Sequence, residues 1–367
     1  MAGTGPVGVG IIGAGVISNT YIENLTSFAD TEVLAIGDIF PEVAKAKAAE
    51  HGIPTAGGVD VVLEHPDVEL VINLTIPAAH AEVAGQAIAA GKHVWNEKPL
   101  SLDRPSAQAL LAAADAAGLR VGCAPDTFLG SGLQAVNGVI GGGAIGTPLS
   151  ALFLMQQPGP DRWHPNPAFL FQEGAGPLFD IGPYYLTALV QIFGPVASVA
   201  SIGTKARERR TIMAGPKAGE EFDVTVPSQT VALARFESGQ ALTLVLSFDS
   251  AVPRILLEVT GSDAVLELPD PNMFDGAIKV RNLGADEWET VAETTALSSR
   301  GTGALDMARA IREGRAHRAT GELAYHVLDI MVSMAESAAT GEFVTVESTV
   351  QPAEPLPADW DPLAATL

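Results

Sequence analysis

The sequence predicts an α/β protein in which a parallel sheet covered by helices is followed by a second domain rich in β-strands. Between residues 7 and 125, short apolar runs alternate with helical patterns, which indicates a parallel sheet with helices on both faces. Beyond residue 195 the pattern is mainly β. The chain has 367 residues, more than one ordinary hydrophobic core accommodates. We therefore predict two domains, residues 1–125 and 126–367.

The elements of the first domain are bounded by glycine and proline signals. Gly52, Gly91 and Gly118 each follow an apolar or alanine-rich stretch, as helix-ending glycines do. Pro41 and Pro105 suit the first turns of helices. The expected strands are residues 7–12, 33–37, 70–74, 93–95 and 120–124, and the expected helices are residues 16–28, 41–51, 80–90 and 105–117.

The second domain is predicted to contain hairpins and two late helices. Residues 204–223 change from basic to glycine-rich and acidic, which indicates an exposed excursion. The tail from Gln351 is rich in proline, so it either wraps a neighbour or remains loose. The expected strands are residues 149–155, 231–236, 241–248, 255–260 and 264–268, and the expected helices are residues 303–313 and 321–340.

The composition excludes several classes of partner. The formal net charge of −22 repels phosphate backbones and anionic membranes, so we expect no nucleic acid and no membrane partner. No apolar run approaches the roughly 18 residues of a membrane span, and the N-terminus lacks the pattern of a signal peptide. We therefore expect a cytoplasmic protein. The single cysteine, Cys123, excludes an internal disulfide and a multi-cysteine metal site, and we predict no metal site.

A glycine-rich loop follows the first expected strand. The stretch Gly13-Ala14-Gly15-Val16-Ile17-Ser18 has a G-x-G-x-x-S pattern. Gly13 permits a tight turn, and Gly15 lets the backbone approach a pyrophosphate at the helix N-terminus. Ser18 replaces the usual third glycine and is small enough for helix–strand packing. With a strand before it and a helix after it, this loop is predicted to bind a dinucleotide, with Val16 and Ile17 among its contacts.

Asp38 closes the second expected strand, about 20 residues beyond the loop. A carboxylate at this place bonds the adenosine ribose hydroxyls and repels a 2′-phosphate. No arginine or lysine lies between Ile36 and Val43 to offset that repulsion. We therefore predict NAD in preference to NADP. The alternative is that Asp38 is a turn residue before Pro41.

Two later stretches fall at the carboxyl ends of further strands, where a doubly wound sheet binds its cofactor. Thr75-Ile76-Pro77 follows the strand at 70–74, and His80 follows closely; His80 either contacts the cofactor or has a structural role. The strand at 93–95 leads to Glu97-Lys98-Pro99, in which the proline forces Lys98 out of the helical region. This pair predicts an ammonium held beside the cofactor; a surface ion pair is the alternative.

Together, the Gly13 loop, Asp38, Thr75-Ile76-Pro77 with His80, and Glu97-Lys98-Pro99 resemble the glucose–fructose oxidoreductase/inositol dehydrogenase (Gfo/Idh/MocA) family. The resemblance covers the first domain. It implies a Rossmann dinucleotide-binding domain followed by an α/β domain with a large, mostly antiparallel open sheet. It also implies a pyridine-nucleotide oxidoreductase acting on sugars, cyclitols or related polyols, with Lys98 in the position of the active-site lysine.

The resemblance extends into the second domain through residues 174–184. This stretch is similar to the family's G-G-x-L-x-D-x-G-x-H pattern, with Asp180 at the acidic position and Tyr184 where many members carry histidine. On a continuous helix, Asp180 and Tyr184 would share one face. The alternatives are a charge at a helix N-terminus for Asp180 and a packed aromatic ring for Tyr184.

A proline-dense loop at residues 156–167 displays polar and aromatic groups. Trp163 is predicted to stack on a sugar face, while Arg162 and His164 bond hydroxyl groups. The alternative is a cover between domains with Trp163 in a core. Asp126 follows the last strand of the first domain and is expected to face the same cleft. Many relatives carry basic residues at that place. Asp126 departs from this pattern, so the identity of the substrate is not predicted.

The predicted reaction transfers hydride between NAD and a secondary hydroxyl or ketone of a sugar, glycoside or cyclitol. A positive nicotinamide would lower the pKa of Lys98, so we expect Lys98 and Tyr184 to exchange the proton and Asp180 to orient the substrate. The alternatives are a glycoside hydrolase that uses NAD transiently, a nucleotide-sensing regulator, and an oxidoreductase that retains its cofactor. The open sheet predicts a homodimer or homotetramer, because its free face must be covered.

Overall fold

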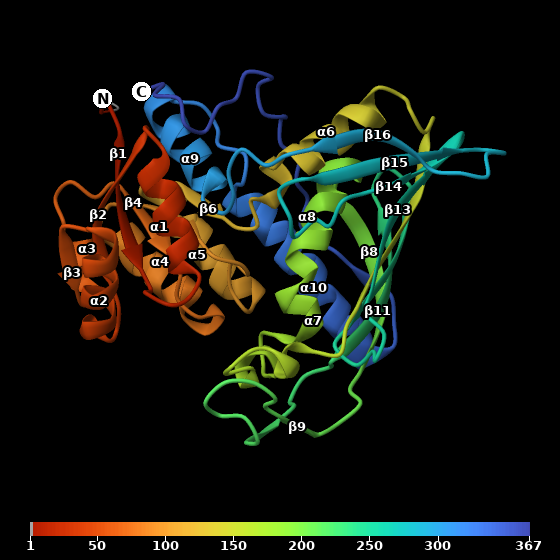
Figure 1. The fold of residues 1–367 in the computed structure, drawn as a ribbon, viewed down its shortest axis with the longest axis horizontal. Helices are drawn as coiled ribbons and strands as arrows, with labels where there is room; N and C mark the ends of the chain where they lie inside the picture. Colours follow the sequence, from red (N-terminus) through yellow and green to blue (C-terminus); the bar gives the residue numbers. More distant parts are fainter. Residues whose placement is uncertain (1–2) are drawn as a thin grey trace. The chain divides into compact units, whose positions relative to one another are not determined.

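The computed structural model of the chain describes residues 3–367, which form two compact units (Figure 1). The first unit comprises the residues up to Gly130 together with Ala296–Leu328 and Ala353–Leu367. The second comprises Ser131–Thr295 and Asp329–Pro352. The division therefore differs from the single boundary expected after residue 125, because two segments from the end of the sequence return to the first unit.

The first unit contains a six-stranded parallel sheet with the order β3-β2-β1-β4-β5-β6. Its central strand β1 is buried at every position, as expected for a strand covered on both faces. β3 was not predicted, since its three residues are too few to show a period. The strands are β1 (Val7–Ile12), β2 (Thr31–Gly37), β3 (Thr55–Gly57), β4 (Leu70–Asn73), β5 (His93–Asn96) and β6 (Val121–Cys123).

The helices of the first unit follow the glycine and proline signals. Pro41 begins α2, and Gly52 ends it in the left-handed conformation. The four-residue α3 was not predicted. The helices are α1 (Ser18–Ser27), α2 (Pro41–His51), α3 (Asp60–Leu63), α4 (His80–Ala89), α5 (Arg104–Ala116) and α9 (Thr302–Glu313). The helix α10 (Gly321–Thr340) begins in the first unit and continues in the second.

The second unit is built on a nine-stranded sheet with the order β16-β15-β14-β13-β7-β12-β11-β8-β17. All neighbouring strands are antiparallel except β7 and β12, so both predicted hairpins, β11–β12 and β13–β14, are confirmed. The strands are β7 (Pro148–Gln156), β8 (Val196–Thr204), β11 (Gln229–Phe236), β12 (Ala241–Ser247), β13 (Arg254–Gly261), β14 (Ala264–Glu267), β15 (Gly276–Asn282), β16 (Glu289–Thr294) and β17 (Val344–Thr345).

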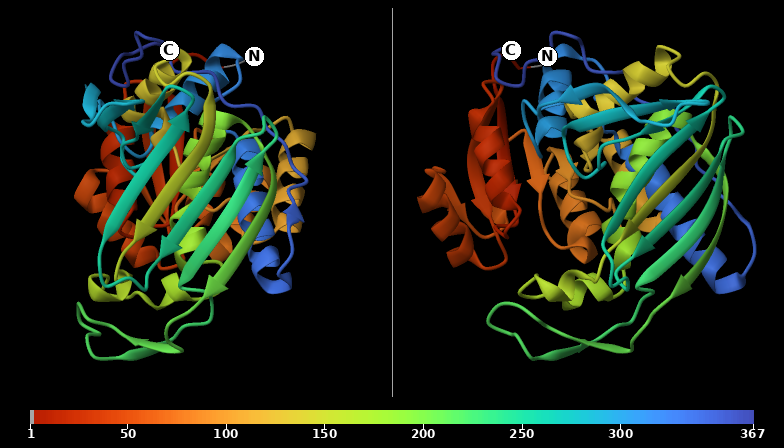
Figure 2. Two further views of the ribbon diagram at one scale, coloured as in Figure 1. Left: turned by 90° about the vertical axis from the view of Figure 1, so that its right-hand side faces the viewer. Right: turned by 45° about the vertical axis from the view of Figure 1, so that its right-hand side comes forward.

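Helices cover one face of this sheet, and the other face is open (Figure 2). The helix α8 (Gly182–Phe193) is buried along almost its whole length. Its Tyr185 packs edge-on against Phe153 of β7, with ring centroids 5.9 Å apart. The remaining helices of the second unit are α6 (Ser131–Gly141) and α7 (Gly176–Asp180).

Residues 204–223 form the exposed excursion that their composition predicted, since most of these residues are exposed. They contain a two-stranded ribbon of β9 (Arg209–Thr211) and β10 (Glu221–Asp223) (Figure 1). Arg210 on this ribbon is buried, with 4% of its surface exposed. A buried arginine needs charged partners, so the ribbon is a docked element of the second unit.

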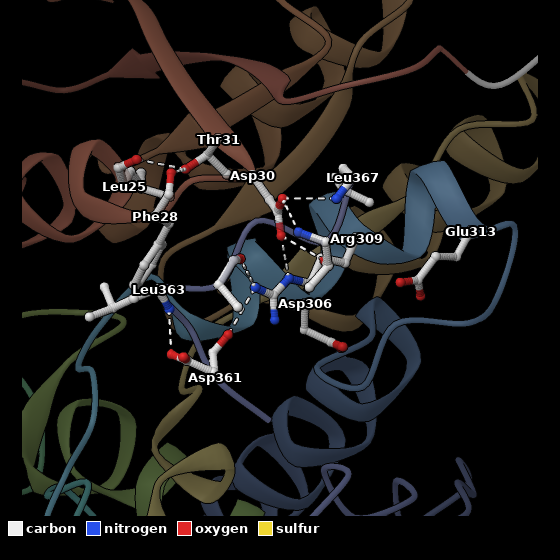
Figure 3. Close-up of polar contacts among 12 residues, drawn as sticks. Leu25, Phe28, Asp30, Thr31, Asp306, Arg309, Glu313, Asp361, Leu363 and Leu367 are labelled. Carbon is white, nitrogen blue, oxygen red and sulfur yellow. Dashed lines mark hydrogen bonds and ion pairs between the residues drawn. The ribbon is translucent and has the colours of Figure 1, made fainter. Parts of the chain in front are cut away.

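The C-terminal tail is also docked, on the first unit. Asp30 accepts hydrogen bonds from the Thr366 hydroxyl (2.8 Å) and from the Leu367 amide (3.1 Å) (Figure 3). Arg309 of α9 donates to Asp30 (2.7 Å) and lies over the ring of Trp360. Burial alone would raise the pKa of Asp30, but the hydrogen bonds from Thr366, Arg309 and Leu367 together lower it. The expectation of a loose tail is therefore wrong.

Candidate functional site

The glycine loop joins β1 to α1 with the geometry that a pyrophosphate requires. Gly13 has φ of +105°, and a Cβ there would lie 2.6 Å from the Leu74 carbonyl oxygen, so only glycine fits. Around Gly15 a Cβ would meet no atom within 4 Å. The buried Ser18 closes the turn by donating its hydroxyl to the Gly15 carbonyl (2.7 Å). The loop therefore fits a dinucleotide, with open space at Gly15 and the N-terminus of α1 beside it.

Asp38 lies directly against this loop. Its carboxylate accepts hydrogen bonds from the Ala14 amide (2.8 Å) and from the Phe40 amide (2.9 Å). Asp38 follows the end of β2 and lies beside the loop. In a dinucleotide-binding fold, the acidic residue that binds the adenosine ribose has this position. Large apolar side chains are exposed on the surrounding segments, as suits contact with an aromatic base: Val16 (90%), Ile39 (77%), Phe40 (64%) and Ile76 (66%).

Two buried asparagines, which the sequence analysis missed, hold the neighbouring loops. Asn73 and Asn96 end β4 and β5 at paired positions, and the Asn73 side-chain amide donates to Asn96 Oδ1 (2.6 Å). Asn73 also donates to the His80 carbonyl (3.0 Å) and accepts from the Thr75 hydroxyl (2.7 Å). Asn96 donates to the Leu100 carbonyl (3.1 Å). The signal was present, because each asparagine ends an otherwise apolar strand.

His80 is buried between two backbone carbonyls. Its ring is 1% exposed, with Nδ1 2.6 Å from the Pro99 carbonyl oxygen and Nε2 3.0 Å from the Thr75 carbonyl oxygen. Burial lowers the pKa of His80, and the hydrogen bonds with the Pro99 and Thr75 carbonyls counteract part of this effect. His80 thereby connects the Thr75-Ile76-Pro77 loop to the turn that carries Lys98.

Glu97 connects that turn to α1. Its carboxylate accepts a hydrogen bond from the Tyr21 hydroxyl (2.8 Å) and one from the Lys98 amide (3.0 Å). Trp95 donates its indole N–H to the Tyr21 oxygen (3.2 Å). Burial, and then the charge of Glu97, raise the pKa of Tyr21 well above its ordinary value, so Tyr21 remains a donor. Sequence spacing did not single out Tyr21, which lies on the buried face of α1.

Asp126, which was expected to face the substrate cleft, is buried against the start of α9. It is 1% exposed, and its Oδ2 accepts hydrogen bonds from the amides of Gly301 and Gly303, each 2.9 Å long. Burial raises the pKa of Asp126 to about 6, although the two amides counteract part of this effect. The carboxylate therefore holds the start of α9, and the sequence analysis could not foresee this because the partners are 175 and 177 residues away.

The remaining predicted residues lie in the second unit. Asp180 ends α7, and Tyr184 lies in the first turn of α8, so they do not share the continuous helix on which the one-face expectation depended. The break falls at Ile181, because Gly182 and Pro183 begin a new helix there. Asp180 is half-buried, and Tyr184 is 8% exposed.

The loop after β7 displays aromatic rings at the surface. Trp163 is 62% exposed, so it is not the core residue of the alternative reading. Its ring centroid lies 5.5 Å from that of His164, which lies 5.6 Å from that of Phe169. Arg162 is exposed beside them. We call Trp163, His164 and Phe169 the aromatic ledge; Phe169 is a member that the sequence analysis did not single out.

The structure thus brings together the predicted cofactor residues of the first unit. The Gly13 loop, Asp38, Thr75-Ile76-Pro77 and Lys98 follow β1, β2, β4 and β5, whose carboxyl ends meet at one edge of the parallel sheet. Within residues 3–367, no helix is both long and apolar enough to cross a membrane.

Family models match both halves of the chain. The model of an oxidoreductase family with an NAD-binding Rossmann fold matches residues 7–124, and the Gfo/Idh/MocA C-terminal domain matches residues 133–267. The chain is 36% identical to an inositol 2-dehydrogenase of Ralstonia nicotianae over 148 residues, which are 38% of this chain and 43% of that protein. It is 38% identical to a dTDP-3,4-didehydro-2,6-dideoxy-alpha-D-glucose 3-reductase of Actinomadura kijaniata over 120 residues, which are 32% of this chain and 36% of that protein. Each alignment spans less than half of the relative.

A solved structure shows the same fold over nearly the whole chain. Levoglucosan dehydrogenase in complex with NADH and L-sorbose superposes with a TM-score of 0.80 at 22% identity, covering 93% of this chain and 99% of that one. The predicted fold class, a Rossmann domain followed by a large, mostly antiparallel sheet, is confirmed. The predicted NAD-binding domain is confirmed by the family model.

The buried Asp126 predicts a pH dependence of stability. Its pKa is about 6 in the folded chain and 3.8 as an ordinary carboxyl, so the native state binds the extra proton between these values. Its stabilising contribution is complete below pH 4 and is lost as the pH rises through 6, by up to about 3 kcal/mol. Urea unfolding of wild type and Asp126→Asn should be measured from pH 4 to pH 8. The difference between their free energies of unfolding should change between pH 4 and pH 6. Asp115→Asn, at an exposed position of α5, is the control; a constant difference for Asp126→Asn would contradict the prediction.

Proposed function

Because the chain belongs to the Gfo/Idh/MocA oxidoreductase family, we propose that it transfers hydride between NAD and a secondary hydroxyl or ketone of a sugar, glycoside or cyclitol. The observation that carries the proposal is the shared edge of the parallel sheet. There, the hydrogen bond between Asn73 and Asn96 fixes the Thr75 loop beside the turn of Lys98. Named relatives act on inositol and on deoxysugars, which supports the substrate class.

The residues of the first unit would bind and orient the cofactor. The open backbone at Gly15 and the N-terminus of α1 would receive the pyrophosphate, and Asp38 would receive the adenosine ribose. Thr75, Ile76 and Pro77 would face the nicotinamide half. Bound NAD would supply the hydride acceptor, and the protein would supply position and proton transfer.

Oxidation of a secondary alcohol also requires that the hydroxyl proton be removed. We assign this proton to Lys98 and Tyr184, with Asp180 orienting the hydroxyl. Lys98 is suited to the task because both of its neighbours are fixed: Glu97 accepts from the Lys98 amide, and the Pro99 carbonyl lies against His80. The assignment requires Lys98 and Tyr184 to reach the same substrate oxygen.

The aromatic ledge is proposed to bind the substrate ring. Trp163 exposes 62% of its surface, and an exposed tryptophan in a loop is a common element of a binding surface. Arg162 and His164 would donate hydrogen bonds to hydroxyl groups. A screen of sugars, cyclitols and glycosides with NAD and with NADP, read at the nicotinamide absorbance, tests the proposed reaction. Absence of turnover with every member of the panel would oppose it.

The first prediction from this proposal concerns the cofactor. The Asp38 carboxylate should favour NAD by accepting from the ribose hydroxyls and by repelling a 2′-phosphate. Asp38→Ser should therefore weaken NAD binding and narrow the difference in Kd between NAD and NADP, as measured by titration calorimetry. Asp60→Ser, on the short helix α3, is the matched control. Tighter binding of NADP than NAD by the wild-type protein would refute the reading of Asp38.

The second prediction concerns catalysis. Lys98→Met keeps the length of the side chain but removes the ammonium, so kcat should fall by about 10²–10⁴-fold while the Kd for NAD changes little. Tyr184→Phe should also lower kcat. If the two residues act as a unit, the double variant should be little worse than the poorer single one. Lys45→Met, on the exposed face of α2, is the control. Near-normal turnover in Lys98→Met would remove Lys98 from the mechanism.

We also propose that the open face of the large sheet joins two copies of the chain. The face carries an apolar row that crosses five strands through directly paired positions. A soluble protein rarely leaves such a continuous patch uncovered. The neighbouring row adds Leu152 and Leu233. The members of the first row are Ile202, Val231, Val245, Leu154 and Leu256.

A charge in this row should therefore separate the copies. Val231→Glu would place a carboxylate at the centre of the proposed contact, where it would lose its water without gaining a partner. We expect a dimer or tetramer for the wild type and at least a 10-fold weaker association for the variant, as measured by sedimentation velocity. Leu283→Glu, at a position that is 86% exposed, is the control. A wild-type protein that is monomeric at micromolar concentration would refute the proposal.

A further inference from the structure

Arg210 is a buried cation in the part of the second unit that adjoins the aromatic ledge. It lies on β9 of the two-stranded ribbon, directly opposite Phe222 of β10. Its side chain is 2% exposed. We define the ribbon as Lys205–Thr225. No residue of this segment belongs to the motifs from which the proposed function was built.

The guanidinium of Arg210 joins three segments that are distant in sequence. It donates to Asp161 Oδ1 (2.6 Å) in the loop that carries the ledge, and to Asp249 Oδ1 after β12. Further hydrogen bonds reach the carbonyls of Pro158 (3.1 Å) and Phe248 (2.8 Å). The loop, the ribbon and the end of β12 therefore meet at one side chain.

Arg210 also touches the far end of the same loop. Its guanidinium carbon lies 4.7 Å from the centre of the Phe171 ring, within the range of a cation–π contact. Phe171 packs in turn against Phe222 of the ribbon (5.5 Å between centroids) and Phe248 (5.7 Å). Asp161 and Phe171 thus fix the two ends of the segment within which Trp163, His164 and Phe169 lie.

Other contacts of the ribbon follow this segment from end to end. The Met213 amide donates to the Asp161 carbonyl (2.8 Å), and the Thr225 amide donates to the Phe171 carbonyl (3.0 Å). Near the middle, a Cβ on Gly215 would lie 2.5 Å from Pro165 Cβ, so the two backbones are in close contact. The ribbon therefore contacts the loop at both ends and near its middle, and Figure 1 and Figure 2 show the two segments as neighbours at one end of the sheet.

The charges around Arg210 fix the positions of the segments that they join more than they increase the free energy of unfolding. One buried cation faces two carboxylates, and Asp249 is compensated further by the Ser228 hydroxyl (2.6 Å) and the Ala206 amide (3.2 Å). A buried ion network gains little stability over apolar packing, because desolvation offsets the attraction. Such a network does restrict the arrangement of the segments that it joins, since each alternative leaves a buried charge unpaired.

We propose that Arg210 is a positioning residue for substrate recognition: through the ribbon, it holds the aromatic ledge where the ring of a cyclic sugar or cyclitol stacks. The inference rests on the proposed function and narrows its substrate class. Trp163 and Phe169 of the ledge are exposed, and such rings offer most to the flat C–H face of a cyclic ligand and little to an open-chain polyol. Substitution of Arg210 should therefore affect cyclic substrates selectively, without an effect on the cofactor.

The test compares Arg210→Met with Arg210→Lys, which retains the charge and is expected to rescue in part. For the cyclic substrate found in the screen, Arg210→Met should raise KM by about 3- to 10-fold, the size of effect expected for the loss of one aromatic contact. The kcat and the Kd for NAD should stay within about 2-fold of wild type. Arg209→Met is the matched control, because Arg209 lies on the same strand but pairs with Glu221 and Asp223 at the surface. An unchanged KM in Arg210→Met would overturn the proposal.

A second variant covers the case in which Arg210→Met does not fold. Arg210→Met combined with Asp161→Asn and Asp249→Asn leaves no uncompensated charge in the cluster, and its circular dichroism should match that of the wild type. The proposal requires this variant to show the same rise in KM for the cyclic substrate, together with faster tryptic cleavage in the ribbon. A wild-type KM in the folded triple variant would assign the cluster to stability alone and overturn the proposal.

Direct binding separates this inference from the proposed reaction. Saturation-transfer NMR with myo-inositol, methyl β-D-glucopyranoside and sorbitol does not depend on turnover. Saturation-transfer signals of the two cyclic ligands should be present with the wild type and absent with both Trp163→Ala and the triple variant. This result would support the inference even if the screen found no hydride transfer. Turnover in the screen with equal NMR signals from sorbitol and the cyclic ligands would leave the proposed reaction intact and overturn the inference.

Discussion

The hydrogen bond between Asn73 and Asn96 is the contact on which the cofactor edge of the first unit depends. Both side chains are fully buried at the ends of paired parallel strands, where an amide without partners would cost about 1–3 kcal/mol. The pair satisfies this demand by also bonding Thr75, the His80 carbonyl and the Leu100 carbonyl. The requirement to pair two buried amides thus determines the course of both loops, and with it the position of the turn that carries Lys98.

Buried ion pairs attach segments that lie far apart in the sequence. Arg309 and Asp30 fasten the tail to the first unit, and Arg210 fastens the ribbon to the loop of the second. In each case an arginine bonds backbone carbonyls as well as carboxylates, as its planar, multidentate group allows. Because such networks gain little net stability, their effect is to make one arrangement of the segments much better than any other.

Sequence alone predicted the elements whose signals are local. The strand at 7–12 and the helices at 41–51 and 321–340 have the predicted bounds, since their periods and end signals lie within them. The glycine loop and Asp38 could also be identified from the sequence, because the spacing of the glycines reflects the backbone geometry of the loop. The roles of Asp126 and Arg210 were not, because their hydrogen-bond partners lie 38 to 177 residues away and neither composition nor period reports such a distance. Trp163 and His164 of the aromatic ledge were singled out, and the exposure of residues 204–223 was predicted, but the contact between the two segments was not.

The proposed cofactor residues and the aromatic ledge are held in place by different kinds of structure. The cofactor residues follow the strands of a rigid parallel sheet, where hydrogen bonds between strand ends leave them little freedom. The ledge lies in a loop whose position depends on the ribbon, and loops tolerate changes in length and sequence that strand ends do not. Changes in the ribbon could therefore move Trp163 without disturbing the turn of Lys98.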